Sequence, residues 1–189
     1  MPHILIVGGT GMLSGVTDYF TQHGCTVSVI ARNSSGLNKL IESKSEHGFI
    51  NPIKADYSDY NSLEEKLRSA IDNYGEINTA VCWIHSTAPD APYIIADVLN
   101  EQNNNCKFFH VLGCEEKDPE KQTPDIKYSF ERFVNLIYKK IILGFVLEDE
   151  TSRWLTNTEI SNGVTDAIIR EKDSFIVGKT EPWNQHPPF

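Results

Sequence analysis

Hydrophobic segments alternate with amphipathic segments along nearly the whole chain. Short runs of aliphatic and β-branched residues with few polar positions predict buried strands. Between these runs, apolar residues recur at helical spacing, as at Leu63, Leu67 and Ala70. The strands are therefore expected at residues 3–7, 26–31, 49–54, 79–84, 107–112, 140–147 and 174–177.

Helices are expected between consecutive strands, and polar caps mark two of them. Asn61 with Glu64 resembles a capping box, in which each side chain bonds the backbone N–H of the other position. Thr156 with Glu159 has the same spacing and predicts another helix start. The expected helices lie near residues 12–20, 37–41, 61–74, 94–99, 129–136 and 156–168.

Strands that alternate with helices indicate an α/β fold whose parallel sheet is covered on both faces. Right-handed crossovers favour the doubly wound Rossmann order 3-2-1-4-5-6, with the seventh strand at an edge. Pro52 lacks a backbone N–H, which argues against a central place for the third strand. We expect one domain over residues 1–180 and an irregular tail, 181–189, rich in proline and aromatic residues.

Composition and charge narrow the classes of function. The chain has 189 residues, 40% of them hydrophobic, which fits a globular domain. A net charge of −9 argues against nucleic acid or an anionic membrane as a partner. No apolar run reaches the roughly 18 residues of a membrane span, and the start lacks the features of a signal peptide. Four cysteines without metal-binding spacing indicate reduced thiols in a cytoplasmic protein, with no metal site.

A glycine-rich stretch, Gly8-Gly9-Thr10-Gly11-Met12-Leu13-Ser14-Gly15, follows the first expected strand directly. Glycines let the backbone turn sharply and approach a ligand, and the N-terminus of the next helix favours a diphosphate. The alternative is an ordinary strand-to-helix turn. Arg32, Asp56, His85 and Cys114 fall at the carboxyl ends of other strands, where ligands bind in doubly wound sheets.

Gly8-x-x-Gly11 within this stretch resembles the opening of the fingerprint G-x-x-G-x-x-G of the short-chain dehydrogenase/reductase superfamily. The likeness covers residues 3–178 and is greatest to the small atypical members. The third glycine is displaced, because Ser14 stands in its place and Gly15 follows. The resemblance implies a dinucleotide cofactor, NADP or NAD, and an oxidoreductase activity.

Arg32 stands where NAD-preferring members carry an acidic residue for the ribose 2′-hydroxyl. Its fork of donors suits a 2′-phosphate, so NADP is preferred to NAD; the alternative is a solvated surface arginine. The resemblance also implies that Asp56 binds the adenine amino group beside Tyr57, although Asp56 is equally suited to begin a turn. The expected cofactor contacts are Gly8, Gly9, Thr10, Gly11, Met12, Leu13, Arg32, Asn33, Ser34, Asp56, Tyr57, Ile84 and His85.

The catalytic set of the family is largely missing. Gly113-Cys114 stands where the resemblance implies a serine, and Tyr128 with Arg132 replaces Tyr-x-x-x-Lys. Arg132 can lower the pKa of Tyr128 if one helical turn joins them, whereas the alternative is a packing role for the tyrosine. His85 is another candidate for proton transfer, or it only satisfies a hydrogen bond.

Three interpretations therefore stay open. The first is an NADP-dependent reductase of a small carbonyl-type substrate, with Tyr128 or His85 as proton donor. The second is a non-catalytic NADP-binding sensor or interaction module, which the missing catalytic residues suggest. The third is a retained fold that binds no nucleotide. The expected partners are a dinucleotide, an unidentified small molecule and further copies of the same chain in a homo-oligomer.

Overall fold

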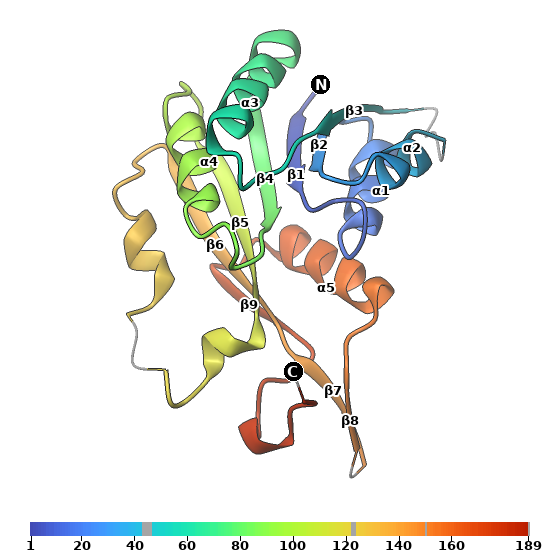
Figure 1. Cartoon of the computed structure of the whole chain (residues 1–189), viewed down its shortest axis with the longest axis vertical. Helices are drawn as coiled ribbons and strands as arrows, with labels where there is room; N and C mark the ends of the chain where they lie inside the picture. Colours follow the sequence, from blue (N-terminus) through green and yellow to red (C-terminus); the bar gives the residue numbers. More distant parts are fainter. Residues whose placement is uncertain (43–46, 122–123, 150, 189) are drawn as a thin grey trace.

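The computed structural model describes residues 1–42, 47–121, 124–149 and 151–188, and a parallel sheet forms its centre (Figure 1). The strand order β3-β2-β1-β4-β5-β6-β9 confirms the doubly wound order expected from the sequence. Each neighbouring pair in this sheet is parallel. The strands are β1 (His3–Val7), β2 (Thr26–Ala31), β3 (Phe49–Lys54), β4 (Ile77–Trp83), β5 (Cys106–Gly113), β6 (Leu136–Leu143) and β9 (Ser174–Val177).

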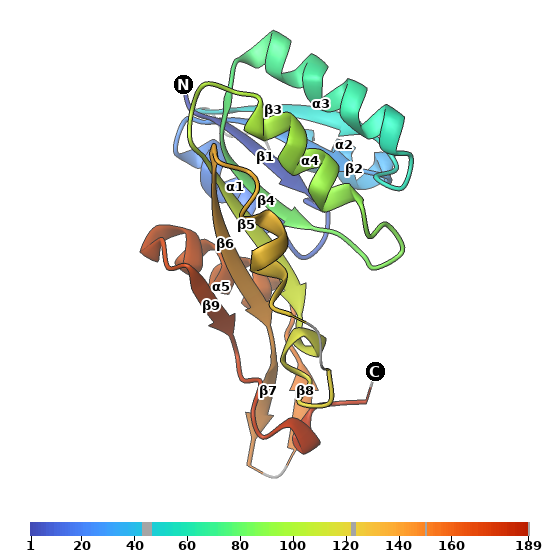
Figure 2. The ribbon, with the colours of Figure 1, turned by 90° about the vertical axis from the view of Figure 1, so that its left-hand side faces the viewer.

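Helices cover the two faces of the sheet unequally (Figures 1 and 2). One face packs against α3 and α4, and the other packs against α1, α2 and α5. None of the described helices is long and apolar enough to cross a membrane. The helices are α1 (Ser14–Gln22), α2 (Ser34–Glu42), α3 (Tyr60–Tyr74), α4 (Ala91–Asn100) and α5 (Asn157–Arg170).

The hydrophobic pattern explains where these elements pack. All residues of β1 and β2 are buried, as expected for strands covered on both faces. In α3 the predicted apolar face is buried through Leu63, Leu67 and Ala70. Pro52 lies on β3, an edge strand that pairs only with β2 among the described strands, so its missing N–H leaves no partner unsatisfied.

The two expected helix caps had different outcomes. The capping box of Thr156 and Glu159 at the start of α5 is confirmed. The capping box of Asn61 with Glu64 is wrong, because α3 begins two residues earlier. Asp59 caps this helix by accepting a hydrogen bond from the backbone N–H of Ser62 at 3.2 Å.

The expected strand over residues 140–147 is wrong in both of its bounds. The strand β6 starts earlier and ends before Gly144, and the chain then leaves the sheet as a hairpin of β7 (Phe145–Glu148) and β8 (Thr151–Trp154). The backbone of Lys179 lies directly against Gly144, where a Cβ atom would collide with it. A distant segment therefore packs against the chain at the point where β6 ends.

The segment between β5 and β6 also differs from expectation. The helix predicted near 129–136 is absent; the described residues form two 3₁₀ helices instead, η1 (Cys114–Lys117) and η2 (Ile126–Phe130). Consequently no long described helix follows α4 on its face of the sheet (Figure 2).

The tail contains a short 3₁₀ helix, η3 (Trp183–Gln185), and packs on the hairpin. Trp154 Nε1 donates a hydrogen bond to the carbonyl of Pro188 at 3.2 Å. The last tail residue, Phe189, lies outside the described residues.

Candidate functional site

The turn between β1 and α1 has the conformation that a phosphate cradle requires. Gly8 has a φ of 83°, and a Cβ there would lie 2.8 Å from the carbonyl oxygen of Trp83. A Cβ on Gly11 would meet nothing within 4 Å, so this side of the turn is open. Among the described residues, none accepts a hydrogen bond from the N–H of Gly11 or Met12. Open space and free donors therefore suit an anion such as a diphosphate.

The displaced third glycine has a structural role. A Cβ on Gly15 would lie 2.8 Å from Cβ of Ser161, so α1 and α5 approach closely at this point. The Ser161 hydroxyl accepts from the N–H of Gly15 at 3.1 Å and donates to the carbonyl of Met12 at 2.7 Å. Ser161 thus holds the end of the glycine-rich turn, and the sequence analysis missed it. Gly15 itself was the available signal for a close contact.

A cavity of about 260 Å³ opens beside this turn, at the carboxyl ends of β1, β2 and β4. Eight of the expected cofactor contacts line it, together with Ala31 and Trp83. The eight residues are Gly8, Thr10, Gly11, Met12, Arg32, Asn33, Tyr57 and His85.

The other five expected cofactor contacts do not line this cavity. Gly9 approaches the core side chains of β1 and β2, and Leu13 is fully buried in the core. Ile84 packs against the opposite core, on the α3 side. Ser34 and Asp56 lie on the exposed surface near the cavity.

Arg32 lines the cavity, whereas Asp56 forms hydrogen bonds with a neighbouring residue. The Arg32 guanidinium lies over the ring of Tyr57 at 5.4 Å and lines the cavity. Asp56 accepts hydrogen bonds from the backbone N–H and the hydroxyl of Ser58, and these bonds, with a smaller effect of Arg32, lower its pKa. Asp56 thus makes local turn bonds through Oδ1, and its contact with adenine stays a prediction.

A second cavity, of about 250 Å³, adjoins the first and has a mostly apolar lining. Met12 and Trp83 border both cavities. Trp154 and Leu155 also line the second cavity, and the sequence analysis missed them because they depend on the unexpected hairpin. The remaining lining residues are Gly113, Cys114, Glu115, Leu143, Gly144 and Ile160.

Comparison with known proteins supports the fold. No protein-family model and no curated protein sequence matches this chain. Solved structures do match: a double mutant of a short-chain dehydrogenase/reductase from Serratia marcescens superposes with a TM-score of 0.71 over 94% of this chain and 96% of its own. This chain has the short-chain dehydrogenase/reductase fold.

Two other structures with this fold give the same result. A bulky-bulky ketone specific alcohol dehydrogenase from Comamonas testosteroni is 16% identical, with a TM-score of 0.67 over 97% of this chain and 90% of its own. A 3-oxoacyl-[acyl-carrier protein] reductase from Brucella melitensis is 13% identical, with a TM-score of 0.65 over 93% and 94%. The Serratia protein is 11% identical. At such identities the likeness concerns the short-chain dehydrogenase/reductase fold alone.

Tyr128 and Arg132, expected to act together, line neither cavity at the carboxyl edge of the sheet. Tyr128 lies on η2 with 57% of its surface exposed, and the Lys127 ammonium lies over its ring. Arg132 instead lies against Tyr93 and Phe133. The shortened segment between β5 and β6 thus keeps this pair away from the glycine-rich turn.

His85 and Cys114 are the candidates that do reach the cavities. His85 lines the first cavity, with its ring edge-to-face against Trp83 at 5.9 Å. Cys114 is buried in the wall of the second cavity, where burial and the neighbouring Glu115 carboxylate raise the pKa of its thiol. A thiol of raised pKa is a poor nucleophile, so Cys114 acts as apolar lining. All four cysteines are free and buried.

Proposed function

We propose that this chain binds NADP across the carboxyl edge of the sheet and reduces a small carbonyl-type substrate. The observation that carries the proposal is the pair of adjoining cavities on either side of Met12 and Trp83. One cavity contains the glycine-rich turn and a cationic side chain, and the other has a mostly apolar lining. A dinucleotide needs such a polar site for its phosphates beside a drier site for its reacting ring.

The residues of the first cavity divide the binding between them. The free N–H groups of Gly11 and Met12 would bind the diphosphate. Arg32 would bind the 2′-phosphate with its planar fork of donors, and Tyr57 would hold the guanidinium in place. When bound, the cofactor would supply a hydride to a substrate in the apolar cavity. His85, which lines the first cavity and lies against Trp83 at the border of the second, would hold the proton that the reduced substrate takes up.

Titration with NADPH and NADH tests the proposal. We expect the wild-type protein to bind NADPH more tightly than NADH. Arg32→Ala should weaken the binding of NADPH about 10- to 100-fold, in line with about 1.5–3 kcal/mol for a charged hydrogen bond. NADH affinity should change little, because NADH lacks the 2′-phosphate. Arg170→Ala, an exposed arginine at the far end of α5, is the matched control. Equal losses for both cofactors would show that Arg32 does not recognise the 2′-phosphate.

Oxidation of NADPH with a panel of ketones, quinones and imines tests the chemical half of the proposal. We expect turnover with small apolar acceptors, reduced in His85→Gln. Tight NADPH binding without turnover would instead support the non-catalytic module.

A further inference from the structure

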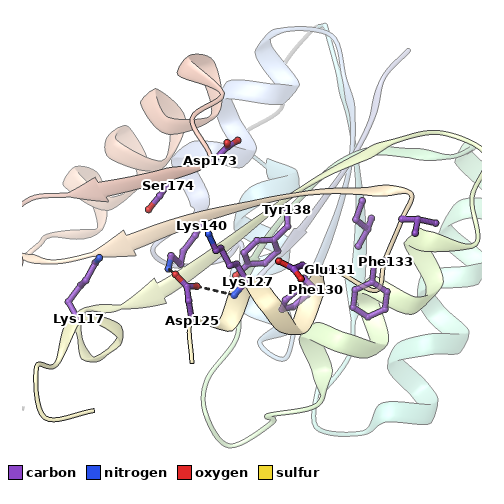
Figure 3. A pocket seen from close by; sticks show the side chains of 12 residues that line it. Lys117, Asp125, Lys127, Phe130, Glu131, Phe133, Tyr138, Lys140, Asp173 and Ser174 are labelled. Carbon is purple, nitrogen blue, oxygen red and sulfur yellow. Dashed lines mark hydrogen bonds and ion pairs between the residues drawn. The ribbon is translucent and has the colours of Figure 1, made fainter. Parts of the chain in front are cut away.

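A larger cavity, of about 540 Å³, lies away from the carboxyl edge (Figure 3). It is formed by η2, the residues that follow it, and the side of β6 on which Tyr138 and Lys140 project. None of its lining residues lines the two cavities of the proposed cofactor site. Its volume is within the range of roughly 300–1,000 Å³ found for small-molecule sites. It occupies the part of the sheet face that no long described helix covers.

One wall of this cavity is apolar and aromatic. Phe130 and Phe133 are almost fully buried, and the rings of Phe130 and Tyr138 stack at 4.4 Å. Val134 lies on the same side with 81% of its surface exposed. Such a wall suits a flat or aliphatic body that enters from solvent.

Next to the Tyr138 ring, on the same side of β6, the cavity contains a buried cation with unused donors, Lys140 (Figure 3). The side chain of Lys140 is only 8% exposed, and its ammonium bonds the Asp125 carboxylate at 2.6 Å. An ammonium has three N–H donors, and Lys140 uses one of them on a described residue. A buried ammonium with spare donors favours an acceptor inside the cavity.

The rim of this cavity carries charges of both signs. Lys117 and Lys127 line the cavity, and neither forms an ion pair within the described part of the chain. Of the acidic lining residues, Asp125 pairs with Lys140 and Asp173 pairs with Lys139, which lies outside the lining. Three lysines and three acidic residues therefore line the cavity, which is neutral as a whole in a chain whose net charge is −9. An anion is thus repelled less here than over the rest of the surface.

We infer that the cavity binds a small organic carboxylate with an aromatic or aliphatic body. The carboxylate receives hydrogen bonds from the ammonium of Lys140 and lies near the Lys117 ammonium at the rim. The body packs against Phe130 and Phe133. The inference stands apart from the proposed cofactor site, because the two share no lining residue.

Calorimetric titration of the full chain with 3-phenylpropionate tests this inference. We expect saturable binding of one equivalent and at least tenfold weaker binding of 3-phenylpropanol, which has the same body without the charge. Lys117→Met should weaken the binding of 3-phenylpropionate at least fivefold and leave the binding of 3-phenylpropanol unchanged. Lys121→Met is the matched control, because Lys121 is exposed on the same segment but does not line the cavity.

A second pair of variants keeps the test decisive. Lys140→Met should abolish carboxylate binding; because it leaves Asp125 without its partner, thermal unfolding must show that the variant is folded. Val134→Asp, at an exposed position, should weaken the binding of 3-phenylpropionate, because it places a negative charge at the mouth of the cavity. Equal binding of acid and alcohol, or unchanged acid binding in Lys117→Met, would overturn the inference. Loss of NADPH binding with 3-phenylpropionate binding intact would contradict only the proposed cofactor site.

Discussion

The contact between Ser161 and the glycine-rich turn shows how a single hydroxyl can set the shape of a binding site. Its two hydrogen bonds fix the N–H of Gly15 and the carbonyl of Met12, which lie about 150 residues earlier in the chain. These bonds orient the first turn of α1, whose neighbouring N–H groups are the proposed diphosphate donors. A residue of α5 therefore acts on the proposed cofactor site without lining it.

Ser161→Ala should weaken NADPH binding severalfold and lower the free energy of unfolding by about 1–2 kcal/mol, because both hydrogen bonds are lost from a buried contact. Fluorescence titration and urea denaturation measure the two effects. Thr165→Ala is the control, since among the described residues the Thr165 hydroxyl bonds only the backbone of its own helix. If both variants bind NADPH equally well, Ser161 does not position the turn.

Among the elements, the β7–β8 hairpin brings Trp154 to the apolar cavity, and polar contacts fix it to α5. The Arg153 guanidinium bonds Glu148 and Glu159, both at 2.9 Å. Glu159 also completes the capping box, and the bonds from Arg153 and Thr156 lower its pKa to about 2. The Glu159 carboxylate therefore bonds both the start of α5 and the hairpin.

Arg153→Ala should release the hairpin while leaving the fold intact, because exposed ion pairs contribute about 0–1 kcal/mol. Hydrogen–deuterium exchange should show faster exchange at residues 145–148 and 151–154. Arg170→Ala removes an ion pair at the other end of α5 and should leave the hairpin unchanged. Unchanged exchange in Arg153→Ala would mean that strand pairing alone holds the hairpin.

Local sequence predicted these elements unevenly, for a physical reason. Strands β1 and β2 are buried on both faces, so most of their residues are apolar and both strands are easily recognised. The hairpin depends on Lys179 packing against Gly144, which is a long-range contact. The site followed the same rule: Arg32 and His85 were predicted from strand ends, whereas Trp154 and Ser161 reach the site through tertiary packing.

For the whole molecule, two buried histidines make stability depend on pH. Burial lowers the pKa of His110 to about 3, and it lowers the pKa of His3 despite an opposing bond to the Gly75 carbonyl. The His110 ring therefore stays neutral in the folded chain at pH values where the same residue takes up a proton in the unfolded chain, and the pKa of His3 is shifted in the same direction. The contribution of these histidines to the free energy of unfolding is complete above about pH 6.5 and is lost as the pH falls.

Urea denaturation between pH 8 and pH 4.5 measures this dependence. The free energy of unfolding should fall below about pH 6.5 by at most about 1.4 kcal/mol per pH unit for each histidine. His110→Gln should reduce the slope, although it loses the contact with the Tyr138 hydroxyl. His23→Gln, at an exposed position, is the control. A slope unaffected by His110→Gln would assign the pH dependence to other groups.

The position of Trp83 has an optical consequence. Its indole borders both cavities at the carboxyl edge, whereas Trp154 borders only the apolar one and Trp183 lies on the tail. These three are the only tryptophans of the chain. Reduced nicotinamide absorbs light at the wavelengths where indole emits, so a dinucleotide across this edge would quench Trp83 by energy transfer. The protein thus carries its own fluorescent reporter at the centre of its proposed cofactor site.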